Sequence, residues 1–127
     1  MDIKGDELVR YYKQKYPLTF IENALWGDSS LDKRYEAAWE IAKKAAGVLK
    51  SDYDAQKVAV FGSLTNRSLF TRWSDIDLAV WGIPDKKFYA AVGAVTSLTT
   101  KFKIDLVDAM ECRASLYKAI KNGGMEI

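Results

Sequence analysis

Two short apolar runs in the middle of the chain constrain its fold more than any other feature. Val58-Ala59-Val60-Phe61 ends at Gly62, and residues 76–81 end at Gly82. Each run has the length and apolar character of a buried strand, and glycine marks the end of each because it permits a tight turn. The sequence therefore predicts two adjoining strands of one sheet, joined by the polar, irregular loop between them.

Helical patterns surround these strands. An apolar residue recurs every three or four positions from Leu31 to Leu49, which predicts a long helix with one apolar stripe, capped by Ser29 or Ser30. Asp85 is the expected cap of a later helix. In chain order we expect helices at about 6–16 and 30–50, strands at 58–61 and 76–81, a helix at 85–98, a strand at 102–107 and a helix at 112–121.

The overall composition is that of one soluble domain. The chain has 127 residues, of which 49% are hydrophobic and 28% charged. No apolar run approaches the roughly 20 residues that cross a bilayer, and the first residues lack the order of a signal peptide. Cys112 is the single cysteine, so the chain cannot form an internal disulfide, which fits a reducing cytoplasm. We expect a structural role for Cys112. A net charge of +2 does not point to direct nucleic-acid binding.

The absence of histidine restricts the chemistry. Ser–His and Cys–His catalysis are excluded, as are the usual histidine-containing zinc sites. A metal would have to bind oxygen ligands, which favours magnesium or manganese. Acid–base catalysis would have to use carboxylates, lysine or tyrosine.

A glycine–serine turn and three acidic residues form the candidate site. Gly62 and Ser63 are followed, after an eleven-residue loop, by Asp75 and Asp77, which share one face because alternate strand residues point the same way. Asp105, in the third expected strand, can join that face. A glycine lets phosphate oxygens approach the backbone, and divalent cations remove the repulsion between carboxylates. This pattern predicts a binding site for a nucleoside triphosphate and two metal ions about 4 Å apart.

Each part of the pattern also has an ordinary explanation. A glycine–serine pair after a strand is often only a turn, and an Asp-x-Asp pair is often a solvated strand end. Their combination with Asp105 favours the functional interpretation. Asp108 competes as the third acid, but it lies on the opposite face, so we expect a loop or capping role for it. Arg67 and Arg72 follow the turn, and either could reach a triphosphate.

Three segments carry a family resemblance. Phe61-Gly62-Ser63, then Ser74-Asp75-Ile76-Asp77-Leu78-Ala79-Val80, then Ile104-Asp105-Leu106-Val107 resemble the DNA polymerase β nucleotidyltransferase superfamily. The small size resembles its minimal nucleotidyltransferase (MNT) proteins. The resemblance covers roughly residues 56–121. It implies an α/β (α+β) fold with a small mixed sheet flanked by helices, and a catalytic core at 56–121. The first 55 residues carry no family motif. From the length and the helical patterns we expect a single domain, residues 1–127, in which residues 1–55 form a helical N-terminal part.

The resemblance also implies residue roles. Gly62 and Ser63 would hold the triphosphate of ATP, while Asp75 and Asp77 would bind two magnesium ions. Asp105 would bind the catalytic metal and help to activate the acceptor hydroxyl.

Two departures from the family pattern affect the triphosphate site. The loop between Ser63 and Asp75 is one residue longer than is common, and Leu64 stands where a basic residue usually follows the glycine–serine pair. Arg67 is the shifted substitute for that basic residue.

Many MNT proteins are antitoxins encoded beside a HEPN-type toxin, an RNase, and some transfer AMP from ATP to a tyrosine of that toxin. The resemblance implies this function and this partner here. Two alternatives stay open. One is a nucleotidyltransferase for a small molecule such as an aminoglycoside, although the stretch after Asp105 is short for the helical substrate domain of those enzymes. The other is an antitoxin that neutralises by binding alone.

Overall fold

The computed structural model describes residues 29–127. The expected helix at 6–16 lies outside this range. Two 3₁₀ turns, Gly62–Thr65 and Arg67–Leu69, follow the first strand. The helices and strands are α3 (Ser29–Asp52), β1 (Lys57–Phe61), β2 (Ile76–Trp81), α4 (Asp85–Thr96), β3 (Ile104–Asp108), α5 (Ala114–Gly123) and β4 (Met125–Glu126).

The four strands form one mixed sheet in the order β3-β2-β1-β4. β1 is antiparallel to β2 and β4, whereas β2 and β3 are parallel and connected through α4. This arrangement confirms the predicted fold class. It also sets the register of the candidate site, because Asp77 pairs with Phe61 on one side and with Asp105 on the other.

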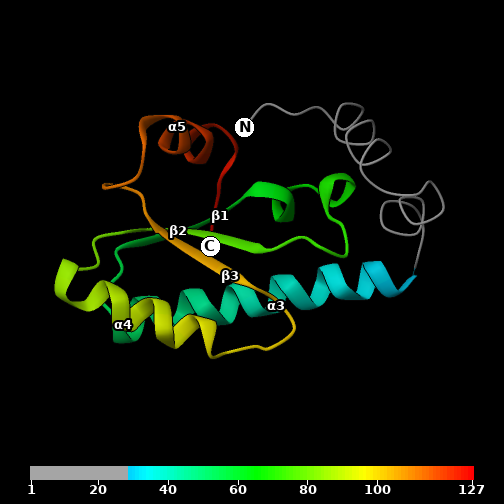
Figure 1. Cartoon of the computed structure of the whole chain (residues 1–127), viewed down its shortest axis with the longest axis horizontal. Coiled ribbons are helices and arrows are strands. Elements are labelled where there is room, and N and C mark those ends of the chain that lie inside the picture. The colour runs from blue at the N-terminus through cyan, green and yellow to red at the C-terminus, as the bar shows by residue number, and fades with distance from the viewer. Residues whose placement is uncertain (1–28) are drawn as a thin grey trace.

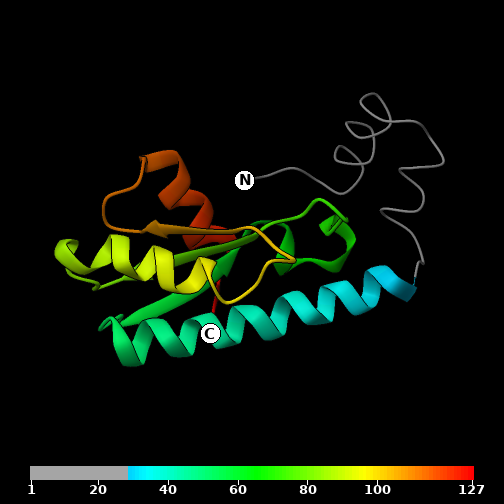
Figure 2. The same ribbon diagram turned by 60° about the horizontal axis from the view of Figure 1, so that its bottom comes forward.

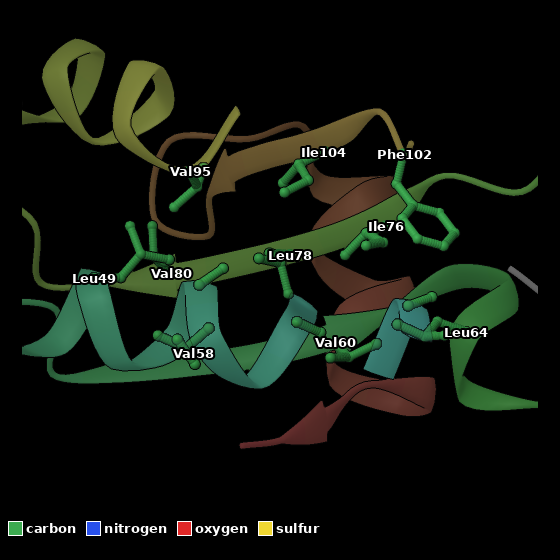
Figure 3. Packing of buried hydrophobic residues seen from close by; sticks show 14 of the residues in the cluster. Leu49, Val58, Val60, Leu64, Ile76, Leu78, Val80, Val95, Phe102 and Ile104 are labelled. Carbon is green, nitrogen blue, oxygen red and sulfur yellow. The ribbon is translucent and has the colours of Figure 1, made fainter. Parts of the chain in front are cut away.

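The helices cover the two faces of the sheet unequally. α3 and α4 lie on one face and α5 lies on the other (Figures 1 and 2). The α3/α4 face holds the main core, where Figure 3 shows side chains of β1, β2 and β3 pointing toward Leu49 and Val95. The α5 face buries a much smaller cluster around Ala79, Ala109 and Ile120. Most of the hydrophobic stabilisation therefore comes from the first face.

The long helix and the two central strands match the sequence prediction closely, and the differences lie at the ends of elements. Pro84, not Asp85, is the N-cap of α4, and Asp85 lies in the first turn. α5 begins at Ala114, not Cys112, because the Cys112 amide donates a hydrogen bond to the Asp108 carbonyl 3.0 Å away and closes a turn. β4, with two residues, was not predicted because so short a strand leaves no pattern.

None of the described helices is both long enough and apolar enough to cross a membrane.

Candidate active site

The turn after β1 is a tight one that requires glycine. Gly62 has a φ of +75°, which is a left-handed conformation. A Cβ atom at Gly62 would collide with the Oδ2 atom of Asp77 on the neighbouring strand. The turn is held by Thr65, whose Oγ1 donates a hydrogen bond of 2.7 Å to the Gly62 carbonyl. The absence of a side chain at Gly62 thus lets the Asp77 carboxylate lie directly against the turn.

Two of the three acidic residues, Asp77 and Asp105, line the same cavity as this turn. Asp77 of β2 and Asp105 of β3 are register partners in the parallel pair, so their side chains project from the same face. Asp75 lies just before β2. Burial raises the pKa of Asp77 to about 6, with further increases from the charges of Asp105 and Asp75 and an opposing effect from Lys103. The charged form of Asp77 is therefore destabilised by burial and by the two neighbouring carboxylates.

A cavity of about 570 Å³ opens beside these residues. Its polar side is formed by the turn and by the carboxylates of Asp77 and Asp105. α5 contributes apolar lining through Leu116 and Ala119. The other lining residues are Phe61, Gly62, Ser63, Thr65, Leu69, Ser74, Leu106, Val107 and Gly123. A cavity with one anionic wall and one apolar wall suits a ligand that combines phosphates, carried on cations, with a flat apolar ring.

The donor atoms fit a hard cation. Asp75, Asp77 and Asp105 provide only oxygen ligands. Burial, and after it the charges of Asp105 and Asp75, raise the pKa of Asp77, and a bound cation would stabilise the charged carboxylate against both effects. Within residues 29–127, no three acidic, histidine or cysteine side chains lie close enough to form a ready-made metal site. Metal binding would thus have to draw the third carboxylate toward the other two.

The two arginines of the loop lie away from the cavity. Arg67 Nη2 lies 2.6 Å from Asp32 Oδ1 on α3, and Arg67 Nε donates to the same oxygen at 2.8 Å. Arg67 would have to leave Asp32 to reach a triphosphate, so its nucleotide-binding role stays a prediction. Arg72 lines a second hollow on the α3 side.

Asp108 and Leu64 occupy other sites. Asp108 Oδ1 accepts a hydrogen bond of 3.0 Å from the Met110 amide, which confirms the expected loop role. Leu64, at the position where a basic residue is usual, is fully buried in the main core.

Sequence reasoning missed two parts of the site. Lys103 Nζ lies 3.7 Å from Asp105 Oδ1, which makes it the cation nearest to the acids in the described part of the chain. Its spacing of two residues before Asp105 could have predicted a shared face. The apolar wall from α5 had no such signal, since its position depends on how the helix packs.

Comparison with known proteins shows the family of the chain. A family profile described as the nucleotidyltransferase domain matches residues 42–124, more than half of the chain. The chain belongs to the nucleotidyltransferase domain family. The family and the superfamily resemblance of the sequence are thereby confirmed. No curated protein sequence matches this nucleotidyltransferase domain.

Solved toxin–antitoxin structures share the fold of this nucleotidyltransferase domain. A toxin–antitoxin structure with AMP-PNP is 22% identical over 67% of this chain and 70% of that chain, with a TM-score of 0.56. A mutant MntA–HpeT complex is 20% identical over 67% and 70%, with a TM-score of 0.54. A MntA–HepT complex is 20% identical over 69% of each chain, with a TM-score of 0.51. At these identities the likeness shows the fold alone.

Proposed function

We propose that this chain is a magnesium-dependent nucleotidyltransferase that transfers AMP from ATP to a tyrosine hydroxyl of a HEPN-type RNase toxin. In this role it is the antitoxin of that toxin and acts in the cytoplasm as a single nucleotidyltransferase domain. The proposal combines the family membership, the geometry of the cavity and the likeness to toxin–antitoxin structures, one of them with AMP-PNP.

One observation carries the proposal. The glycine-containing turn, Ser63, and the register partners Asp77 and Asp105 all face one cavity. In this proposal the triphosphate lies against the turn, where Gly62 allows close approach and Ser63 donates a hydrogen bond. The apolar α5 wall then receives the adenine ring.

The reaction is a displacement at the α-phosphorus of ATP. The tyrosine oxygen of the acceptor forms a bond to this phosphorus, and the bond from the α-phosphorus to the bridging oxygen of pyrophosphate breaks. The acceptor gives up its hydroxyl proton, and we assign the half-exposed Asp105 carboxylate, which lines the cavity, as the base that accepts it. Pyrophosphate leaves, and AMP remains linked to the acceptor through a phosphodiester bond.

Asp75, Asp77 and Asp105 would hold magnesium, which when bound lowers the charge on the phosphates and stabilises the leaving pyrophosphate. Asp77 is the ligand that gains most, because burial and the neighbouring carboxylates destabilise its charged form. Lys103 partly offsets this charge in the metal-free protein.

The test is transfer of label from α-labelled ATP to a HEPN-type protein encoded beside this chain, with and without magnesium. We expect label on the partner only with magnesium, and loss of label in Asp75→Ala and Asp77→Ala. Transfer by these variants at the wild-type rate would refute the proposal. A partner whose acceptor tyrosine is replaced by phenylalanine is the matched control for the transfer site.

Two other outcomes would assign a different function. Label on an aminoglycoside and not on the protein partner would make the chain a small-molecule nucleotidyltransferase. Full protection from the toxin by the triple Asp→Asn variant of Asp75, Asp77 and Asp105, without transfer, would show neutralisation by binding alone.

A further inference from the structure

A second hollow, of about 590 Å³, lies on the α3 side of the sheet and is strongly basic. We call it the basic hollow. Of its lining residues within the described part of the chain, four are cationic and none is acidic. They come from the first turns of α3, from the loop before β2 and from the loop before β3. The lining residues are Ser30, Leu31, Lys33, Arg34, Ala37, Arg72, Lys101 and Phe102.

The arginine at the centre of the basic hollow is held in place. The Arg34 guanidinium lies 4.2 Å from the centroid of the Phe102 ring, and its Nη2 donates a hydrogen bond of 3.1 Å to the Lys101 carbonyl. Its Nε is buried without a hydrogen-bond partner in the described part of the chain. A rigid guanidinium loses little entropy when it binds a carboxylate, so Arg34 is preorganised for an anion.

Two of the surrounding lysines have no ion pair with an acid of residues 29–127. Lys33 and Lys101 are exposed, and no acidic side chain in that range forms an ion pair with either. Asp32, the nearest acid in sequence, is turned toward Arg67. The N-terminus of α3 adds its partial positive charge. Positive charges gathered in one hollow repel one another, and an anionic ligand would remove that repulsion.

The basic hollow and the active-site cavity lie on opposite faces of the sheet but at the same end of it, where β2 and β3 begin. Arg72 precedes Asp75 by three residues, and Lys101 precedes Asp105 by four. At about 3.3–3.6 Å per extended residue, these spacings are at most roughly 10 and 14 Å. A partner segment anchored in the hollow would pass around this end of the sheet to bring a hydroxyl to the cavity.

The surroundings favour an acidic protein segment over a nucleic acid. Asp32 and the exposed Glu36, on the same helix beside the hollow, confine the positive surface to a short stretch, which suits a short acidic segment better than a continuous phosphate backbone. Phe102 is buried and covered by Arg34, so it offers no face on which a base could stack. Two or three carboxylates on a short segment match the size and the charge of the hollow.

We infer that the basic hollow docks an acidic segment of the acceptor protein and so directs its hydroxyl to Asp77 and Asp105. This inference rests on the proposed function, in which the acceptor is a protein. It assigns Lys33, Arg34, Arg72 and Lys101 to acceptor recognition rather than to catalysis.

The direct experiment measures binding of a fluorescein-labelled hexaglutamate peptide to the full chain by fluorescence anisotropy at low salt, without ATP. The test variant is Lys33→Glu combined with Lys101→Glu. The control variant is Lys44→Glu combined with Lys86→Glu, which changes the net charge equally at exposed positions away from the hollow. Both variants place one glutamate near a helix N-terminus, so neither is expected to unfold.

We expect the test variant to bind the peptide at least about tenfold more weakly than wild type, and the control to bind within about twofold. If both variants bound the peptide equally weakly, net charge alone would explain the loss of affinity, and the inference would be overturned. Tighter binding of a decauridine oligonucleotide than of the peptide, lost in the test variant, would overturn it in favour of nucleic acid.

A second measurement separates this inference from the proposed function. In the transfer assay with the HEPN-type partner, the test variant should raise KM for the partner and leave kcat and KM for ATP unchanged. Absence of any transfer by wild type, together with hollow-dependent peptide binding, would refute the proposed function and keep the binding site. Normal KM for the partner in the test variant would refute the docking role alone.

Discussion

The two faces of the sheet use the same strands for opposite purposes. On the α3/α4 face of β2, Ile76, Leu78 and Val80 are completely buried in a closed apolar core. On the α5 face, Asp77 alternates with them and borders an open cavity. Since alternate residues of a strand point to opposite faces, one strand can supply stability and chemistry through separate side chains. Substitutions on the α3/α4 face should therefore lower stability, whereas substitutions on the α5 face should lower the rate of the proposed AMP transfer.

The largest expected effect is on the α5 face. Asp77→Asn keeps the shape of the side chain but removes the charge, so AMP transfer should fall by about 10³-fold, which is at the upper end of the loss on removing one group that stabilises transition-state charge. The transfer assay with α-labelled ATP measures the rate, and circular dichroism checks that the fold is retained. A rate within tenfold of wild type would break the assignment of chemistry to this face.

The matching change on the α3/α4 face is at Leu78, the next residue along β2. Leu78→Ala should lower the free energy of unfolding by about 2–5 kcal/mol, because it leaves a cavity in the main core. Urea denaturation measures this quantity. At a temperature where the variant is still folded, kcat should stay within a few-fold of wild type. A large loss of kcat in the fully folded variant would show that the two faces are not independent.

At Gly62 the backbone of the turn lies directly against the Asp77 carboxylate. Gly62→Ala should lower the free energy of unfolding by about 1–3 kcal/mol, because the residue has a positive φ and its Cβ would meet the Asp77 carboxylate. Gly47→Ala is the matched control, since no atom lies within 4 Å of its would-be Cβ on a helix. A loss no greater than in the control would contradict the close approach of turn and carboxylate.

The pH dependence of stability should report the charge of Asp77. Its pKa is raised from 3.8 to about 6 in the folded protein, so folding favours the protonated acid. The contribution of Asp77 to stability is therefore present below about pH 4 and is lost as the pH rises to about 6.

In the metal-free protein at pH 8, Asp77→Asn should accordingly be more stable than wild type by roughly 1–2 kcal/mol, after allowance for partial exposure. The difference should vanish near pH 4 and shrink when magnesium is added. Urea denaturation at both pH values checks this. A less stable variant at pH 8 would contradict the assigned cause of the shift.

The smallest expected effect concerns Lys103. Its charge lowers the pKa of Asp77, so Lys103→Ala should raise that pKa by less than about one unit. The carboxyl ¹³C shift of Asp77, followed by NMR across pH in the metal-free protein, measures the change. Lys118→Ala, on the outer side of α5, is the control. An unchanged pKa of Asp77 would show that Lys103 does not contribute to the electrostatics of the site.

Much of the fold could be predicted because its signals are local. The apolar stripe from Leu31 to Leu49 predicted α3, and the alternation in residues 76–81 predicted β2 to the residue. The spacing of Asp75 and Asp77 predicted a shared face by the period of a strand. The family resemblance, carried by the segments around Gly62, Asp77 and Asp105, was confirmed by the family match.

Other features could not be predicted because they depend on contacts between distant segments. Arg67 was expected to face the nucleotide, yet it pairs with Asp32, which lies 35 positions earlier. β4 exists only because two residues at the end of the chain pair with β1. The basic hollow gathers cations from three separate segments, and none of them stands out in the sequence.

The sequence by itself determined which residues could do the chemistry, since a chain without histidine has carboxylates as the ligands for a hard metal. It also determined the period of each element, because periodicity is a property of neighbouring residues. Only the tertiary structure decided that Asp77 and Asp105 are register partners, that α5 forms the apolar wall and that Arg67 is held by α3. The physical reason is that register, helix packing and ion pairing are set by free energies of contact between segments far apart in the chain.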